Sequence, residues 1–265
     1  MFFPKKSKKS LGQNFLIDKN IIKKIVEVGE ITSQDTILEI GAGTGNLTEF
    51  IVNKKPQKFF VFEKDHRLIE ILKQKFKDKV IIINNDILKV REELISEKKL
   101  IVFGNLPYNI STKILSKWIT NKSKKNWYKC FILMFQKEVA DRIIAEVNTK
   151  NYGRLSILSS WKLKIEKITN ISSSCFYPKP KIKSTLLKFT PKNDYFQIKN
   201  SKNLETITKV LFNQRRKMIK KSLNSIFKNR IDIAKKLNLN LNLRPQNLSP
   251  ELYYEITREY ENLIK

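Results

Sequence analysis

Short runs rich in β-branched and aromatic residues alternate with longer amphipathic stretches between residues 36 and 136. This rhythm is typical of βαβ units, in which successive strands pair in parallel and helices cover the sheet. Two further runs before residue 190 would complete a sheet of seven strands. The expected strands are Thr36–Gly41, Lys58–Phe62, Val80–Asn84, Leu100–Gly104, Lys129–Phe135, Trp161–Ile168 and Thr185–Phe189. The sequence therefore predicts an α/β fold with a mostly parallel, seven-stranded sheet.

The chain changes character near residue 190. Before this point, Asp18 is a suitable N-cap for a helix with isoleucines on one face, and Ser172–Lys183 forms a loop stiffened by prolines. After it, apolar residues recur at helical spacing, at Leu204, Ile207, Val210 and Leu211 and again at Leu252, Ile256 and Tyr260. We expect an α/β domain over residues 1–190 and a small α-helical domain over residues 191–265.

A formal charge of +28 predicts attraction to a polyanion, and nucleic acid is the commonest polyanionic partner of such a chain. The alternative is coding bias, because only nine of the 53 basic residues are arginine and Lys, Asn and Ile are abundant throughout. The charge gives salt-sensitive affinity for RNA or DNA whatever its origin. It identifies a class of partner and not a function.

Several classes of protein are disfavoured. No apolar run approaches the length of a membrane span, and the basic start of the chain lacks the apolar stretch of a secretory signal, so we expect a cytoplasmic protein without a membrane partner. Cys130 and Cys175 are too few for a disulfide framework or a metal site, and His66 is the only histidine. We expect reduced structural thiols, no metal, and a monomer.

Three of the seven glycines fall in Gly41-Ala-Gly43-Thr-Gly45, directly after the first expected strand. A glycine turn there lets a ligand lie against bare backbone at the carboxyl edge of the sheet. Glu63 ends the second strand, where it could accept the ribose hydroxyls of a nucleoside, and Asp86 ends the third, where it could accept an adenine amino group. A helix cap is the alternative role for each acid. These features do not separate nicotinamide dinucleotides from S-adenosylmethionine.

Asn105-Leu106-Pro107-Tyr108 follows the fourth expected strand and favours the second cofactor. An Asn oxygen and a backbone carbonyl can accept hydrogen bonds from an adenine amine, while an aromatic ring stacks on the base. A strand-ending turn is the alternative for this tetrapeptide on its own. Hydride transfer needs no adenine clamp at this position, so the combination favours methyl transfer over a nicotinamide oxidoreductase.

These motifs, in this order, make the chain resemble the ribosomal RNA adenine dimethyltransferases of the KsgA/RsmA type. The likeness runs nearly from end to end. It also includes Leu11-Gly12-Gln13-Asn14-Phe15-Leu16, Phe103-Gly-Asn-Leu-Pro-Tyr-Asn-Ile-Ser111, Gln136-Lys-Glu-Val139, Tyr152-Gly-Arg-Leu-Ser156, Phe176-Tyr-Pro-Lys-Pro-Lys181 and Phe212-Asn-Gln-Arg-Arg-Lys217.

The resemblance implies a Rossmann-like class I methyltransferase that uses S-adenosylmethionine. Its acceptors would be two adjacent adenines in the 3′-terminal hairpin loop of small-subunit rRNA, and an immature small ribosomal subunit would be its partner. The implied roles are as follows: the cofactor is bound by Asn14, Leu16, Gly41, Gly43, Glu63, Asp86 and Asn105, and the target adenine is held by Asn105, Leu106, Pro107, Tyr108 and Phe176. A core position beside a proline turn is the alternative for Phe176.

Two related groups stay open as alternatives. Methyltransferases of large-subunit rRNA share the catalytic motifs, but Leu106, the Asn-Ile-Ser after Tyr108 and the Phe212-Asn-Gln-Arg-Arg segment argue against them. Mitochondrial transcription factors of the same scaffold bind nucleic acid without catalysis, and the intact 105–108 clamp argues against that role. Lys179 between the two prolines and the Asn-rich C-terminal part depart mildly from the family pattern.

Contacts to the RNA backbone are expected from the C-terminal domain. The candidates form one basic run, Arg215, Arg216, Lys217, Lys220 and Lys221. A solvated helix face is the alternative for any single member.

Overall fold

The computed structural model describes residues 13–121 and 126–264, apart from the side chains of Tyr108 and Asn109. Contacts divide the chain into two compact units. Unit 1 consists of Met1–Leu115, Ser123–Ala140 and Lys164–Pro191, and unit 2 of Ser116–Lys122, Asp141–Leu163 and Lys192–Lys265. The sequence-based division at residues 190 and 191 assigns two of these segments differently, because units built from non-contiguous segments leave no compositional boundary.

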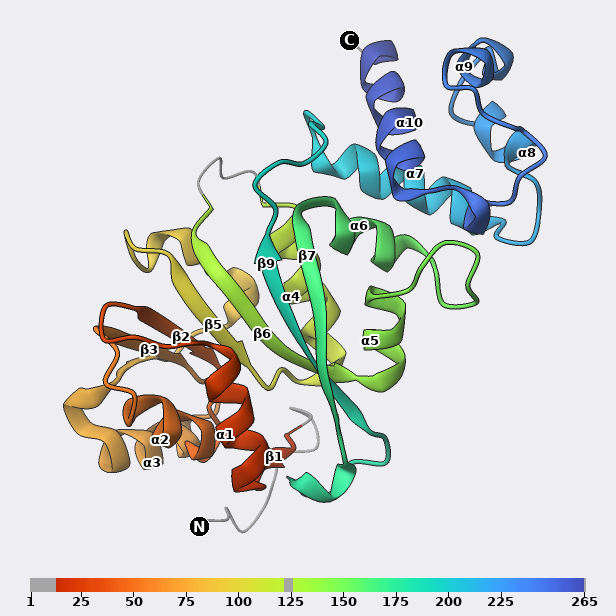
Figure 1. The fold of residues 1–265 in the computed structure, drawn as a ribbon. Helices are drawn as coiled ribbons and strands as arrows, with labels where there is room; N and C mark the ends of the chain where they lie inside the picture. Colours follow the sequence, from red (N-terminus) through yellow and green to blue (C-terminus); the bar gives the residue numbers. More distant parts are fainter. Residues whose placement is uncertain (1–12, 122–125, 265) are drawn as a thin grey trace. The chain divides into compact units, whose positions relative to one another are not determined.

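Unit 1 is built on a seven-stranded sheet with the order β4-β3-β2-β5-β6-β9-β7 (Figure 1). The strands are β2 (Thr36–Ile40), β3 (Lys58–Phe62), β4 (Ile81–Ile83), β5 (Leu100–Gly104), β6 (Tyr128–Gln136), β7 (Leu163–Ile171) and β9 (Ser184–Pro191). The first five pair in parallel, and β9 runs antiparallel to β6. The predicted fold class is confirmed.

One strand begins later than predicted. Trp161 and Lys162 end a helix, α6 (Arg154–Lys162), and β7 starts only at Leu163. The stretch 155–163 places Leu155, Ile157, Trp161 and Leu163 at alternate positions and interrupts them at Ser159, and so short a pattern suits a buried helix as well as a strand.

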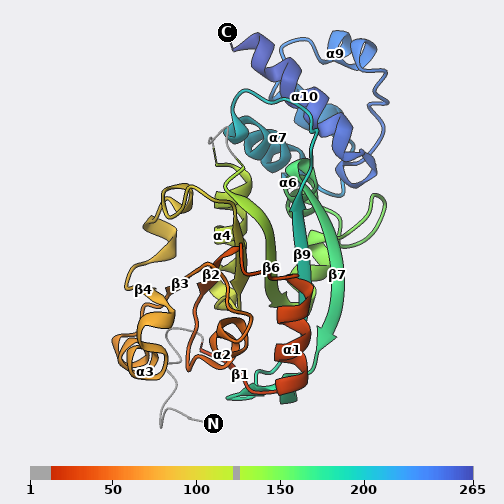
Figure 2. The same cartoon turned by 60° about the vertical axis from the view of Figure 1, so that its left-hand side comes forward.

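Helices cover both faces of the sheet. In Figures 1 and 2, α1 (Lys19–Val28) and α2 (Asn46–Val52) lie on one face and α4 (Tyr108–Ile119) on the other. Asp18 caps α1 as predicted, since its Oδ1 accepts hydrogen bonds from the N–H groups of Asn20 (2.9 Å) and Ile21 (3.0 Å). The remaining helical elements of unit 1 are α3 (His66–Phe76), the start of α5 (Lys137–Ile143) and 3₁₀ turns at Lys77–Lys79, Ile87–Lys89, Glu92–Leu94 and Ser173–Cys175.

A two-stranded ribbon that the sequence did not predict joins the N-terminal segment to the proline loop. β1 (Phe15–Leu16) pairs antiparallel with β8 (Phe176–Tyr177), with Phe15 opposite Tyr177 and Leu16 opposite Phe176. Two-residue strands show no detectable period in a sequence. The ribbon brings residues 160 positions apart into contact at one place.

Unit 2 is helical. It contains α6, α7 (Ser201–Asn213), α8 (Ile219–Asn224), α9 (Arg230–Lys236), α10 (Pro250–Leu263) and a 3₁₀ turn at Pro245–Asn247. The rings of Phe212 and Tyr253 stack with centroids 5.7 Å apart, and Tyr152 Oη donates a hydrogen bond to the Leu248 carbonyl at 2.9 Å. These contacts tie α7 and α10 to the 141–163 segment.

Both cysteines are buried and free of disulfide bonds. Within the described residues, no helix combines the length and the apolar composition needed to cross a bilayer.

Candidate active site

A glycine turn connects β2 to α2. Gly41, Gly43 and Gly45 adopt φ angles of +72°, +61° and +76°, a region that residues with a Cβ rarely occupy. A Cβ at position 43 would lie 2.8 Å from Cδ1 of Phe15. Glycine is therefore required at position 43 both for the backbone conformation and for close packing against the N-terminal segment.

Glu63 follows β3 and is only 7% exposed. Its Oε2 accepts a hydrogen bond from the Gly43 N–H at 3.0 Å, and its Oε1 accepts from the N–H groups of Lys64 and Asp65 at 2.8 and 2.9 Å. Burial raises the pKa of the Glu63 carboxyl, and these donors oppose the rise. The N-cap of α3 is Asp65, so the helix-cap alternative does not apply to Glu63.

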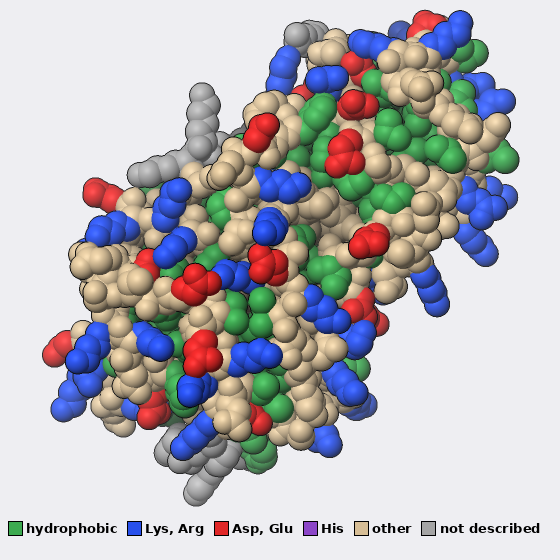
Figure 3. Space-filling model, in the orientation of Figure 1, with side chains coloured by type: hydrophobic (Ala, Val, Ile, Leu, Met, Phe, Trp, Pro, Cys, Tyr) green, Lys and Arg blue, Asp and Glu red, His purple; other side chains and the backbone are tan. Residues whose placement is uncertain are grey.

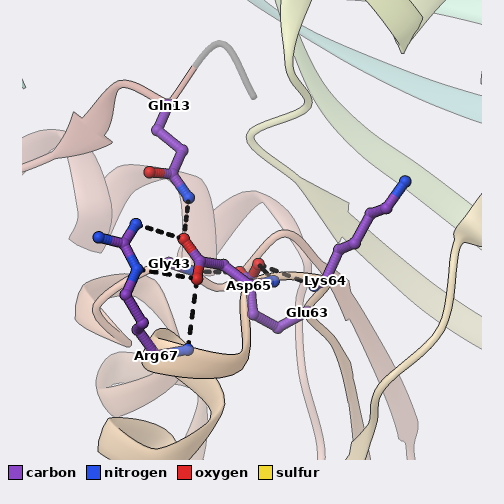
Figure 4. A network of polar contacts seen from close by, with 6 residues as sticks. All are labelled: Gln13, Gly43, Glu63, Lys64, Asp65 and Arg67. Carbon is purple, nitrogen blue, oxygen red and sulfur yellow. Dashed lines mark hydrogen bonds and ion pairs between the residues drawn. The ribbon is translucent and has the colours of Figure 1, made fainter. Parts of the chain in front are cut away.

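Figure 4 shows how Asp65 fastens the N-terminal segment beside Glu63. The Asp65 carboxylate accepts hydrogen bonds from Gln13 Nε2 at 3.1 Å and from Nη2 and Nε of Arg67 at 2.7 and 3.1 Å. The Arg67 guanidinium holds the pKa of Asp65 well below its usual range. The same residue thus positions Glu63 through its backbone and Gln13 through its side chain.

Asp86 lies after β4 and is shared between two roles. Its Oδ1 accepts a hydrogen bond from the Leu88 N–H at 3.0 Å, which caps the Ile87–Lys89 turn, and its Oδ2 pairs with Lys64 Nζ at 3.0 Å. The Leu88 N–H and the Lys64 ammonium lower the pKa of the Asp86 carboxyl. Asp86 therefore does cap a helical turn, which was the alternative role given for it, and it also lines the cavity described below.

The N-terminal segment meets the 105–108 turn. Nδ2 of Asn105 donates a hydrogen bond to the Asn14 carbonyl at 2.9 Å, and Nδ2 of Asn46 donates to the Leu16 carbonyl at 2.8 Å. With its amide nitrogen engaged in this way, Asn105 keeps its side-chain oxygen as an acceptor for another group.

One backbone carbonyl of the 105–108 turn, that of Pro107, already accepts hydrogen bonds within the protein. The Pro107 carbonyl accepts the N–H groups of Ile110 and Ser111 at 3.0 and 3.1 Å and so starts α4. Leu106 is 1% exposed and packs over Gly104, where an added Cβ would lie 2.9 Å from Leu106 Cδ2. The Leu106 carbonyl is thus the better candidate for a second acceptor. The Tyr108 side chain lies outside the described part of the chain.

A cavity of about 290 Å³ opens at the carboxyl ends of β2, β3, β4 and β5. This volume is close to the lower end of the range for small-molecule sites, about 300–1,000 Å³. The structure brings most of the expected residues to its wall, namely Asn14, Leu16, Gly41, Gly43, Glu63, Asp86, Asn105, Leu106 and Pro107. All of them belong to unit 1.

Glu39, the last residue but one of β2, is a lining residue that sequence reasoning missed. It is 2% exposed, and its Oε2 accepts a hydrogen bond from Thr48 Oγ1 at 2.7 Å. Burial raises the pKa of the Glu39 carboxyl to about 8, aided by the nearby Glu63 charge and opposed by Thr48. The only signal in the sequence was an acid at an otherwise apolar strand position.

Phe176 does not line the cavity. It is 2% exposed and belongs to the buried core cluster that also contains Ile22 and Ile25 of α1. Its neighbour Tyr177 is 50% exposed. Phe176 therefore occupies a core position in this structure, which is the alternative that the sequence analysis gave for it.

The basic run of unit 2 is divided. Arg215 is half-buried: its Nη2 donates to the carbonyls of Thr149, at 3.4 Å, and Lys150, and its Nε donates to Gln246 Oε1. The other four members, Arg216, Lys217, Lys220 and Lys221, are exposed. Figure 3 shows Lys and Arg side chains spread over the visible face with Asp and Glu among them, so net charge alone does not mark an RNA surface.

No group of three or more His, Cys, Asp or Glu side chains capable of holding a metal occurs among the described residues.

Comparison with known proteins settles the family. The family described as ribosomal RNA adenine dimethylase matches residues 4–262. The chain belongs to this family. The ribosomal RNA small subunit methyltransferase A of Pelagibacter ubique is 58% identical over 97% of this chain and 98% of its own length, and that of Ehrlichia ruminantium is 40% identical over 94% and 95%.

Solved structures agree with this assignment. A dimethyladenosine transferase from Plasmodium falciparum superposes with a TM-score of 0.82 at 27% identity, covering 94% of this chain and 98% of that one. The 23S rRNA methyltransferase ErmE superposes with a TM-score of 0.70 at 20% identity, covering 94% of this chain and all of that one. The second likeness shows the shared Rossmann-like fold alone.

The cavity fits the S-adenosylmethionine that this dimethylase family uses. The buried Glu63 carboxylate accepts three backbone N–H groups, which leaves one further acceptor site, on Oε2, for a ribose hydroxyl. The positive-φ glycines leave bare backbone beside it, and Asp86 offers an acceptor further along the strand ends. The acidic side chains of Glu63 and Asp86 also suit a ligand that carries positive charge.

Proposed function

We propose that this dimethylase transfers methyl groups from S-adenosylmethionine to N6 of two adjacent adenines in the 3′-terminal hairpin loop of small-subunit rRNA, and that each adenine receives two. The observation that carries the proposal is the Asn105–Asn14 hydrogen bond, which joins the base-holding turn to the cofactor segment at the wall of one cavity. The names of the closely related bacterial proteins support small-subunit rRNA over large-subunit rRNA.

The chemistry requires orientation more than a base. The lone pair of an adenine amine is delocalised into the ring, and Asn105 Oδ1 together with the Leu106 carbonyl would accept its two N–H groups and favour a more tetrahedral nitrogen. Pro107 fixes the backbone between them. We assign stacking on the base to Tyr108, the first residue of α4. Stacking by Phe176 requires its ring to leave the core; in the present state it anchors β8.

The bound cofactor supplies a methyl carbon on a positively charged sulfur. Asn105 Oδ1 and the Leu106 carbonyl would direct the adenine lone pair at this carbon, so that methyl transfer would leave the cofactor sulfur as a neutral thioether and the proton would pass from the alkylated nitrogen to water. Positioning by the protein can contribute about 7–11 kcal/mol to such a step, which agrees with a site in which no histidine lines the cavity among the described residues.

RNA contacts outside the cavity are assigned to the exposed members of the basic run in unit 2, Arg216, Lys217, Lys220 and Lys221. Contacts of this kind fix register on the backbone and offset the cost of extruding an adenine, a few kcal/mol that is smaller in a loop than in a duplex. Arg215 supports this surface by holding the 149–150 backbone. We further propose that the enzyme acts as a cytoplasmic monomer on an immature small subunit.

The test is incubation of the protein with labelled S-adenosylmethionine and undermethylated small subunits, followed by mapping of the modified nucleotides. We expect label on two adjacent adenines near the 3′ end of the small-subunit rRNA. Naked rRNA in a parallel reaction distinguishes a free RNA substrate from a partly assembled subunit. Label confined to large-subunit rRNA, or no label at all, would overturn the proposal.

A further inference from the structure

We propose that Tyr177, Lys179, Lys181 and Lys183, termed here the 177–183 surface, bind the rRNA strand next to the target adenine. The inference rests on the proposed function and adds an RNA contact within unit 1, separate from the basic run of unit 2.

Topology places this surface at the working edge of the sheet. β9 runs antiparallel to β6, with Ser184 opposite Gln136, so the residues that enter β9 lie at the carboxyl end of β6. The Lys137 N–H donates to the Lys183 carbonyl at 2.9 Å and fixes this end of the segment. The cavity opens at the same edge, after the carboxyl ends of β2 to β5.

A short chain of contacts joins the surface to the catalytic turn. Tyr177 pairs with Phe15 in the β1–β8 ribbon. The residue before Phe15, Asn14, accepts the hydrogen bond from Asn105 at 2.9 Å, and the residue after it, Leu16, lines the cavity. A nucleotide stacked on Tyr177 would therefore lie beside the strand that borders both the cofactor and Asn105.

The chemistry of the surface suits single-stranded RNA. Tyr177 is 50% exposed, and Lys179, Lys181 and Lys183 are all exposed. The segment 172–183 contains no Asp or Glu. An exposed ring with lysines around it offers a stacking platform for a base and partners for phosphates, the combination typical of single-strand binding sites. Contacts so close to the cavity would set which nucleotide enters it.

Charge removal tests the lysines. We expect Lys179→Gln/Lys181→Gln/Lys183→Gln to weaken binding of small subunits about tenfold and to reduce the salt slope of log Kd by about 2, since each phosphate contact contributes about 0.7–0.9 to that slope. The cofactor Kd should change by less than about twofold, as for surface substitutions in general. The matched control is Lys54→Gln/Lys58→Gln/Lys79→Gln, three exposed lysines at the opposite, amino edge of β3 and β4.

Ring removal tests Tyr177. Tyr177→Ala should raise the KM for small subunits about tenfold, within the range measured for loss of one base-stacking contact, whereas Tyr177→Phe should restore it. A folding defect in Tyr177→Ala would instead raise the cofactor Kd as well, whereas loss of stacking leaves the cofactor Kd unchanged.

The outcomes separate the two proposals. If the triple Gln variant binds subunits with the wild-type affinity and salt slope while methylating normally, the surface assignment is wrong and the proposed function stands. If the wild-type protein methylates no rRNA but the triple variant still loses subunit affinity, the surface assignment holds and the proposed reaction is wrong.

Discussion

Nδ2 of Asn105 donates a hydrogen bond of 2.9 Å to the carbonyl oxygen of Asn14, although the two residues are 91 positions apart. This bond fixes the orientation of the Asn105 amide: its nitrogen holds the N-terminal segment, and its oxygen is the acceptor that we propose for the substrate amine. The N-terminal segment and the 105–108 turn, which both line the cavity, are therefore directly connected.

Asn105→Ala should lower kcat about 100-fold or more, a loss typical for one hydrogen-bonding group that acts on the reacting centre. The cofactor Kd should rise by no more than about tenfold, because the lost bond to Asn14 is a single neutral hydrogen bond. Single-turnover methylation and calorimetric titration measure the two effects. Asn53→Ala, at an exposed asparagine that precedes the amino end of β3, is the control; near-normal turnover by the Asn105 variant would refute its assigned role.

Gly43→Ala should lower the Tm by at least about 4 °C and weaken cofactor binding. A left-handed conformation costs a residue with a Cβ about 1–2 kcal/mol, and the new methyl group would also displace the Phe15 ring, 2.8 Å away. Gly153→Ala is the matched control, because Gly153 has an extended φ of −178° and its nearest side-chain atom, Phe212 Cε1, would be 3.9 Å from the added Cβ. Equal Tm values for both variants would contradict the argument.

Gln13→Ala should raise the KM for the cofactor about tenfold with little change in kcat. Its amide donates to the Asp65 carboxylate, and a hydrogen bond to a charged group contributes about 1.5 kcal/mol. A general folding defect would lower kcat as well, so the split between KM and kcat identifies positioning. Gln57→Ala removes a comparable bond to Lys98 at the amino edge of the sheet and should leave both constants unchanged.

Charge reversal of Arg216, Lys217, Lys220 and Lys221 should weaken binding of small subunits and reduce the salt slope of log Kd by about 3. Arg215→Gln should behave differently, with a lower Tm and a slope change below about 1, because Arg215 serves the 149–150 carbonyls. Filter binding over a salt series measures the slope. Charge reversal of the exposed lysines 150, 202, 228 and 235 is the control. An equal change of the salt slope in that variant would show that the basic run acts only through the net charge of the protein and makes no specific RNA contact.

The sequence predicted those parts of the site whose position follows directly from the order of the strands along the chain. In a parallel sheet every carboxyl end lies at one edge, so Gly41, Glu63, Asp86 and Asn105 had to converge once the strands were recognised. The mostly parallel sheet and the cap at Asp18 follow from equally local patterns.

What the sequence could not supply depends on tertiary contacts. The β1–β8 ribbon is too short to carry a period, and the burial of Phe176 beside the exposed Tyr177 depends on which face of that ribbon is turned to the core. Arg215 differs from Arg216 only in reaching carbonyls 65 residues away. Glu39 occupies a strand position that an apolar residue could fill, so its place at the cavity emerges only when β2 and α2 pack together.

Glu39→Gln should flatten the dependence of folding stability on pH. The pKa of Glu39 is about 8 in the folded protein against a usual value of 4.5. Between these values the unfolded chain has released a proton that the folded protein retains, so the free energy of unfolding falls as pH rises, by up to about 1.4 kcal/mol per pH unit. Glutamine cannot ionise and removes this contribution, while Glu63, whose pKa is also raised, leaves a slope of the same sign. Denaturant unfolding across this window measures the slopes, with the exposed Glu70→Gln as control; a Glu39 variant that loses stability as steeply as the wild type would show that the buried carboxyl is already ionised.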